Sequence, residues 1–134
     1  MRGRQNRMIS LDTNVVLRFL LNDIPEETKK ADVLIKQNKV YVTDVTLMEI
    51  IYVLERALSL PRKEIKELII SFLSFANVVH NTVFLIDAVT FYSQHPSLSI
   101  VDCYASAEAS AYHNRLVTFD KRLVSQGGDH VDSL

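Results

Sequence analysis

The stretch Met8-Ile9-Ser10-Leu11-Asp12-Thr13-Asn14-Val15 contains a short apolar run, 8–11, that ends at an acidic residue. We predict a strand there, an apolar helix over 15–21, and an amphipathic helix over 26–37 with Pro25 at its first position. The same reading predicts strands over 40–42, 76–80, 116–118 and 130–131, helices over 45–58, 61–75, 81–94 and 100–114, and a helical turn over 121–124. Short strands that alternate with longer helices indicate an α/β fold with a parallel sheet.

The composition indicates one compact domain over residues 1–134. The chain is 48% hydrophobic and 23% charged, with a formal net charge of −1, which excludes a disordered or fibrous chain. It contains no uninterrupted apolar stretch of about 18 residues, no export signal and one cysteine, so we expect a cytoplasmic protein outside the membrane. Residues 1–7 carry three arginines and represent either a disordered basic arm or an extension foreign to the native chain.

Four acidic side chains lie beside apolar sequence. Glu49 is the only charge within 45–54, in a helix that looks apolar on nearly every side, so we expect it to be buried. Asp12 and Asp120 come at or just after the ends of predicted strands, and Asp102 lies in the apolar start of helix 100–114. A buried carboxylate costs several kcal/mol unless it is protonated, paired or bound to a cation.

Each of these acids also stands where a helix begins. Asp12 and Asp120 fit N-cap positions, while Glu49 and Asp102 each follow a Thr or Ser by three residues, the spacing of a capping box. Capping is the more frequent role for any single one of them. Helices that follow parallel strands nevertheless begin at one edge of the sheet, where ligand sites form, so caps after different strands converge.

A converged cluster of carboxylates requires positive charge. Two carboxylates about 4 Å apart repel by about 4 kcal/mol at an effective dielectric constant near 20, and helix N-termini supply only about half a charge each. All-oxygen ligation favours Mg²⁺ or Mn²⁺ over zinc, for which the chain lacks suitable Cys and His spacing. We interpret Cys103, Tyr52 and Tyr104 as core residues.

These residues together resemble a known family, the PIN-domain ribonucleases, and in size and layout the VapC-type toxins of toxin–antitoxin pairs. The resemblance lies in Leu11-Asp12-Thr13-Asn14-Val15, Glu49, Asp102 and Thr118-Phe119-Asp120-Lys121-Arg122, which span nearly the whole chain in order. It implies a three-layer α/β fold with a parallel sheet of about five strands flanked by helices. It also implies that Asp12, Glu49, Asp102 and Asp120 form a catalytic, metal-binding pocket for Mg²⁺ or Mn²⁺, supported by hydrogen bonds from Asn14 and Thr118.

The expected chemistry is hydrolysis of RNA phosphodiester bonds by an endoribonuclease. We assign Asp12 and Asp120 as direct metal ligands and Asp102 as the residue that completes the set, while Glu49 either binds metal through water or deprotonates the nucleophile. The resemblance further implies an antitoxin partner and a homodimer. The candidate residues that attract RNA phosphates are Arg2, Arg4, Arg7, Arg18, Lys121 and Arg122.

Three other functions compete with this one. A phosphatase of the haloacid dehalogenase type also places an Asp after its first strand, here Asp12, but it needs a second Asp where this chain has Asn14. A phospho-acceptor receiver domain needs an adjacent acidic pair at the first strand, which is absent. A PIN-like module that binds RNA or protein without catalysis has no need for an acid in the apolar helix around Glu49.

Overall fold

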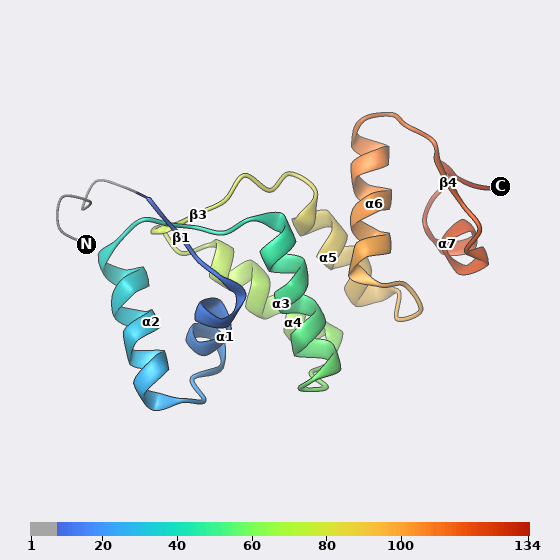
Figure 1. Ribbon diagram of the computed structural model, residues 1–134. Coiled ribbons are helices and arrows are strands. Elements are labelled where there is room, and N and C mark those ends of the chain that lie inside the picture. The colour runs from blue at the N-terminus through green and yellow to red at the C-terminus, as the bar shows by residue number, and fades with distance from the viewer. Residues whose placement is uncertain (1–7) are drawn as a thin grey trace.

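The structure, a computed structural model, describes residues 8–134 and forms seven helices and five short strands over that range (Figure 1). The strands are β1 (Ile9–Ser10), β2 (Val40–Tyr41), β3 (Val78–Val79), β4 (Leu116–Thr118) and β5 (Val131–Ser133). The helices are α1 (Thr13–Leu21), α2 (Pro25–Gln37), α3 (Asp44–Arg56), α4 (Arg62–Leu73), α5 (Leu85–Gln94), α6 (Ile100–Ala111) and α7 (Lys121–Gln126). The predicted alternation of strands and helices is confirmed, while the predictions for residues 1–7 lie outside the described residues.

All strand pairs are parallel, as expected for an α/β fold, but the strands form two sheets. β1, β2 and β3 pair in that order, with Ile9 opposite Val40 and Val40 opposite Val78. β4 pairs with β5, with Leu116 opposite Val131. Figure 1 shows the β4–α7–β5 unit beyond α6, at the end of the molecule opposite the N-terminal strands. The expected sheet of about five strands is therefore divided into a group of three and a group of two.

Two helix boundaries differ from the prediction, one at the start of α5 and one at the end of α6. The Thr82 hydroxyl accepts a hydrogen bond from the Leu85 amide at 3.0 Å in the turn before the helix, and α5 begins at Leu85 rather than at residue 81. At the other boundary, His113 has a φ of 59°, which ends the helical backbone. α6 therefore stops at Ala111 instead of continuing to residue 114.

The expectation that Glu49 is buried is wrong. α3 buries one face only, through Leu47, Ile50, Ile51 and Leu54. Residues 45, 49 and 52 share the opposite face at helical spacing, and there Glu49 is exposed beside Val45 and Tyr52, which are 72% and 57% exposed. The apolar sequence around Glu49 indicated a helix buried on every side, but neighbouring helices cover only part of its circumference.

One hydrophobic cluster holds the helices together. Its fully buried side chains come mainly from α3, α4 and α5, and it includes Leu123 and Val131 of the β4–α7–β5 unit. Cys103 is buried and Tyr104 packs against the cluster, as predicted, whereas the prediction of a core position for Tyr52 is wrong. Within residues 8–134, no helix has the length and apolar character needed to cross a membrane.

Candidate active site

Two acidic residues, Asp12 and Asp44, lie just beyond the carboxyl ends of neighbouring strands of the three-stranded sheet. Asp12 lies two residues after the end of β1, next to Leu11, whose amide donates to the Tyr41 carbonyl at 2.9 Å. Asp12 occupies the N-cap position of α1 without a side-chain capping bond. Asp44 begins α3 just after β2. Because β1 and β2 are parallel neighbours, their carboxyl ends meet at one edge. Sequence reasoning missed Asp44, although its position after a strand is the signal that singled out Asp12.

Asp44 connects α3 to α6. The Tyr104 hydroxyl donates a hydrogen bond of 2.6 Å to Asp44 Oδ2. Burial, followed by this carboxylate, raises the pKa of Tyr104 above its ordinary value, so the phenol remains a proton donor to the bond. The other carboxylate oxygen, Oδ1, is buried and has no hydrogen-bond partner among the described residues. Asp44 therefore keeps one acceptor free near the sheet edge.

Glu49 faces a hollow between α3 and the start of α6. The hollow has a volume of about 580 Å³ and is lined by Glu49, Val45 and Tyr52 on one side and by Ser99 and Val101 on the other. Asp102 follows Val101 on α6. The structure thus places Glu49 and the helix start that carries Asp102 on two sides of one hollow.

Asp102 and Asp120 both cap helices. In α6, the Ser99 amide donates to Asp102 Oδ2 at 3.3 Å and the Asp102 amide donates to Ser99 Oγ at 3.0 Å, which completes a capping box. In α7, Asp120 Oδ1 accepts from the Arg122 and Leu123 amides at 2.9 and 3.4 Å. Each cap uses one carboxylate oxygen for these bonds. Asp102 and Asp120 therefore both have the helix-capping role that their sequence positions predict.

The two predicted supporting residues differ in their surroundings. Thr118 Oγ1 accepts a hydrogen bond of 3.0 Å from the Asp120 amide, so it does orient the backbone of that acid. Asn14 is exposed on α1.

The predicted ligands have the chemistry that a divalent cation requires. Their carboxylate oxygens are the donors that Mg²⁺ and Mn²⁺ prefer. Over residues 8–134, however, no three acidic, histidine or cysteine side chains form a group that could hold a metal ion. Asp120 follows β4 in the separate two-stranded sheet, whereas Asp12 follows β1 in the three-stranded one. Asp12 and Asp120 therefore follow strands that belong to different sheets.

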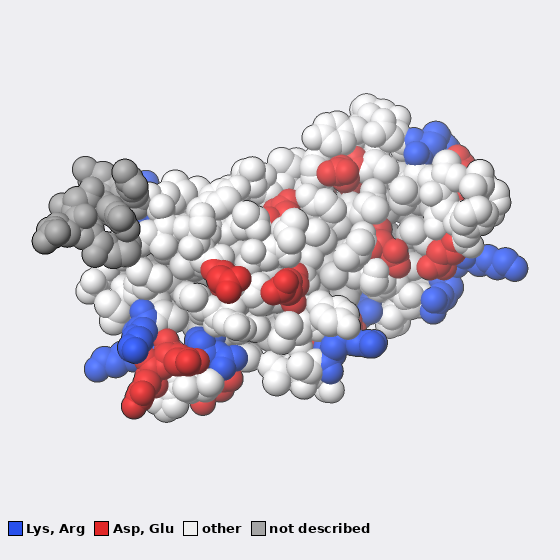
Figure 2. Space-filling view, viewed as in Figure 1, with Lys and Arg blue, Asp and Glu red and all other residues white. Residues whose placement is uncertain are grey.

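Some of the basic residues predicted to attract RNA form ion pairs with nearby acids, and others are exposed. Arg18 Nε lies 3.4 Å from Asp23, between α1 and α2, and its Nη1 lies 3.9 Å from Glu27 on α2. The charge of Arg18 is therefore paired with these two acids. Arg122 lies 3.8 Å from Asp120, and Lys121 is exposed beside it. Figure 2 shows basic side chains at the end of the molecule that carries α7, and acidic side chains predominating over the centre of the same face. Arg2, Arg4 and Arg7 lie outside the described residues.

Arg62 fixes the segment that leads into α6. Its Nη1 donates to the carbonyl oxygens of Tyr92, His95 and Leu98 at 3.0, 3.0 and 2.7 Å. Its Nε donates to Glu55 at 2.7 Å, and its guanidinium lies 3.9 Å from the centre of the Tyr92 ring. These contacts close the end of α5 and hold the loop just before the capping box of α6. Arg62 therefore positions the helix start that carries Asp102.

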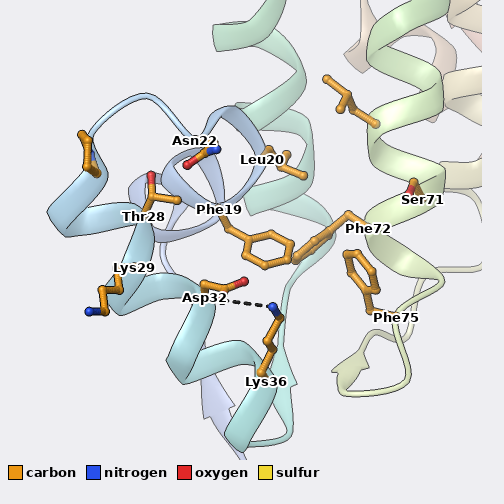
Figure 3. A pocket seen from close by; sticks show the side chains of 12 residues that line it. Phe19, Leu20, Asn22, Thr28, Lys29, Asp32, Lys36, Ser71, Phe72 and Phe75 are labelled. Atoms are coloured by element: carbon orange, nitrogen blue, oxygen red, sulfur yellow. Dashed lines mark ion pairs between the residues drawn. The ribbon is translucent and has the colours of Figure 1, made fainter.

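A second hollow lies at the far end of α1 from Asp12 (Figure 3). Its volume is about 790 Å³, and Phe19, Phe72 and Phe75 meet in it edge to face, with ring centres 5.6 to 6.5 Å apart. Lys36 and Asp32 form an ion pair of 3.1 Å at its rim. Its aromatic lining distinguishes this hollow from the one that contains Glu49.

Comparison with known proteins identifies a family. Residues 9–128 match the family model described as the PIN domain. Five solved chains match, and one of them is VapBC2 from Rickettsia felis, bound to a DNA fragment from its promoter. That alignment has 15% identity and a TM-score of 0.39, and it covers 94% of this chain and 98% of the other. No curated protein matches the chain.

Proposed function

The chain belongs to the PIN-domain family, and from this membership we propose that it is a metal-dependent endoribonuclease that hydrolyses RNA phosphodiester bonds. The observation that carries the proposal is that Asp12, Glu49, Asp102 and Asp120 all fall within the matched residues 9–128, each at or near the start of an element or on the hollow beside α6. The phosphatase and receiver-domain alternatives find no support in the family match.

The charge of the site explains the proposed need for metal. RNA is a polyanion, so a surface that presents several carboxylates repels it until cations neutralise them. We propose Mg²⁺ or Mn²⁺ as that cation, held by Asp12, Asp102 and Asp120. Glu49, exposed on α3, is the proposed group that orients or deprotonates the attacking water.

The proposed biological role is that of a VapC-type toxin. The order and spacing of the four acidic motifs over a single short domain support this role. The proposal includes RNA as substrate, a protein antitoxin as partner, a homodimer as the assembly and the cytoplasm as the location.

Incubation of the purified protein with a mixed RNA pool tests the activity. We expect cleavage with Mg²⁺ or Mn²⁺ and none with EDTA, and we expect Asp12→Asn to lower the rate at least about 100-fold, in the range found when a general catalytic group is lost. Glu67→Gln is the matched control, because Glu67 is exposed on α4, a helix that carries none of the four predicted site acids, and this variant should cut RNA at the wild-type rate. Equal cutting in the presence of EDTA would reject the metal requirement.

A non-catalytic PIN-like binding module is the second candidate. It is favoured by the capping roles of Asp102 and Asp120 and by the absence of a three-ligand group over residues 8–134. This function predicts that RNA or a protein partner binds without being cut. Asp12→Asn would then leave binding unchanged, and no cation would produce cleavage.

A further inference from the structure

A short hydrogen bond joins α6 to the start of α3. The Tyr104 hydroxyl donates to Asp44 Oδ2 at 2.6 Å, and the two residues lie sixty positions apart in the chain. Hydrogen bonds from a hydroxyl to a carboxylate are short and about twice as strong as those between neutral groups. The bond therefore restrains two helices that do not follow one another in the sequence.

The ring of Tyr104 is held as well as its hydroxyl. Tyr104 packs against the hydrophobic cluster, and its ring meets the Phe84 ring edge to face, with centres 6.0 Å apart and an interplanar angle of 87°. Phe84 in turn contacts the Tyr112 ring, with centres 5.4 Å apart. Because a tyrosine has only two side-chain torsions, these contacts fix the position of the Tyr104 hydroxyl relative to α6.

A second polar connection joins the other end of α3 to the segment before α6. Arg62 Nε donates to Glu55 Oε2 at 2.7 Å, and Arg62 Nη1 donates to the Leu98 carbonyl at 2.7 Å. α3 and α6 run in opposite directions (Figure 1), so this connection lies near the end of α3 and the start of α6. The bond to Asp44 lies at the start of α3, so the two helices are joined at two separate levels.

Glu49 lies between the two connections on α3. Asp44 and Glu55 are eleven residues apart, which is about three helical turns, so they share one side of the helix. Glu49 occupies the adjoining exposed side, at the hollow that Ser99 and Val101 line from the start of α6. The bonds at Asp44 and Glu55 therefore flank Glu49 along α3.

Asp102 lies between the same two connections on α6. It follows Leu98 by four residues and precedes Tyr104 by two. Asp102 Oδ2 accepts the capping bond from the Ser99 amide at 3.3 Å, so this carboxylate moves together with the start of the helix. A change in the direction of α6 relative to α3 would therefore alter the separation of Asp102 from Glu49.

We propose that Asp44 and Tyr104 are positioning residues, whose hydrogen bond sets the direction of α6 relative to α3 and thereby the spacing of Asp102 and Glu49. As the proposed metal ligand and the proposed group that handles the attacking water, Asp102 and Glu49 act on the same phosphodiester, so their spacing must match the reaction. The effect on catalysis rests on the proposed ribonuclease function, whereas the effect on the two helices does not.

Tyr104→Phe removes the hydroxyl and keeps the ring. We expect kcat for RNA cleavage with Mn²⁺ to fall by about 10- to 100-fold and KM to change by less than about twofold, since misplacement of a reacting group by about 1 Å costs this much without weakening substrate binding. The melting temperature should fall by no more than about 9 °C, which keeps the variant folded at room temperature. Tyr112→Phe is the matched control, because Tyr112 contacts the same Phe84 ring but is 62% exposed, and it should cleave at the wild-type rate.

Variants of Asp44 separate positioning from an effect of charge. Asn keeps an oxygen that accepts from the phenol, so Asp44→Asn should retain more activity than Asp44→Ala. If the two residues act through their shared bond, Asp44→Ala combined with Tyr104→Phe should lose about as much activity as either change alone. Losses that multiply in full, or a kcat for Tyr104→Phe within about twofold of the wild type, would refute the positioning role.

Distance measurement by electron paramagnetic resonance tests the helices without reference to activity. Spin labels are attached at Arg56→Cys on α3 and Ser110→Cys on α6, both exposed positions, while the native Cys103 is buried. We expect one narrow distance distribution in this labelled protein and a shifted or broader one when Tyr104→Phe is added. Tyr112→Phe should leave the distribution unchanged. The same distribution with and without Tyr104→Phe would refute the proposed effect on α6.

The two experiments distinguish failure of this inference from failure of the proposed function. An active wild type with an equally active Tyr104→Phe variant would leave the ribonuclease function standing and refute the positioning role. An inactive wild type would refute the ribonuclease function and with it the catalytic part of the inference. The distance measurement would then still decide whether the bond between Asp44 and Tyr104 sets the direction of α6.

Discussion

Replacing Arg62 by Met removes the charged group that closes α5 and holds the loop before α6. The Arg62 side chain is only 15% exposed, and its loss leaves the carbonyls of Tyr92, His95 and Leu98 and the Glu55 carboxylate without this donor. Met retains part of the apolar volume over the Tyr92 ring, so the change tests the polar contacts in particular.

The expected loss of folding stability comes from the carbonyl and carboxylate groups that lose their bonds to Arg62. Removing Arg62 costs about 3–5 kcal/mol, because three backbone carbonyls in a part-buried site lose a charged donor at about 1–3 kcal/mol each, while the Glu55 carboxylate, 32% exposed, regains water. Total stabilities are about 5–15 kcal/mol, so the variant loses a large share. At about 3 °C per kcal/mol for a domain of this size, the melting temperature should fall by about 9–15 °C.

Urea unfolding followed by circular dichroism measures the change. We expect a lower midpoint with an unchanged m-value for Arg62→Met, and an intermediate midpoint for Arg62→Lys, which retains the charge but lacks the planar fork. Arg56→Met is the control, since Arg56 is exposed and makes a more distant ring contact of 5.7 Å, and it should change stability by less than about 0.5 kcal/mol. A loss below about 1 kcal/mol for Arg62→Met would refute the assigned role.

Three further predictions concern the core and one surface pair. Phe72→Ala removes a fully buried ring and should cost about 3–5 kcal/mol in thermal unfolding, whereas Phe75→Ala, at a side chain 46% exposed, should cost clearly less; equal losses would contradict the packing. Burial raises the pKa of Cys103 to about 12, so iodoacetamide should alkylate the native protein at pH 8 far more slowly than the urea-unfolded chain, and similar rates would contradict the burial. Arg115 lowers the pKa of Asp132, so the contribution of this pair is present at neutral pH and lost as the pH falls through the lowered value. In Arg115→Gln, a carbon-detected NMR titration should show the Asp132 pKa rising toward its ordinary value, and an unchanged value would show that the pair does not form in solution.

The residues of the candidate site show which structural features a sequence pattern can predict and which it cannot. Capping positions are local, because a Ser or Asp and the amides it bonds lie within three residues, and the capping box at Asp102 and the N-cap at Asp120 were foreseeable for that reason. The exposure of Glu49 was not foreseeable, since an apolar helix does not reveal which of its faces meets another element. Asp44 carried the same local signal as Asp12, a position after a strand, but its bond to Tyr104, sixty residues away in the chain, was not foreseeable.

Local sequence determined the α/β class, the parallel direction of the strands, most of the helices and the match to the PIN-domain family over residues 9–128. These features depend on hydrophobic period, capping and turn residues, all of which act over a few neighbouring positions. Only the tertiary structure decided that β4 and β5 form a sheet of their own and that Asp12 and Asp120 follow strands of different sheets. Strand pairing between distant segments depends on packing, here the fastening of the β4–α7–β5 unit to α6 through Ser106, and a strand carries no local signal of which edge it will join.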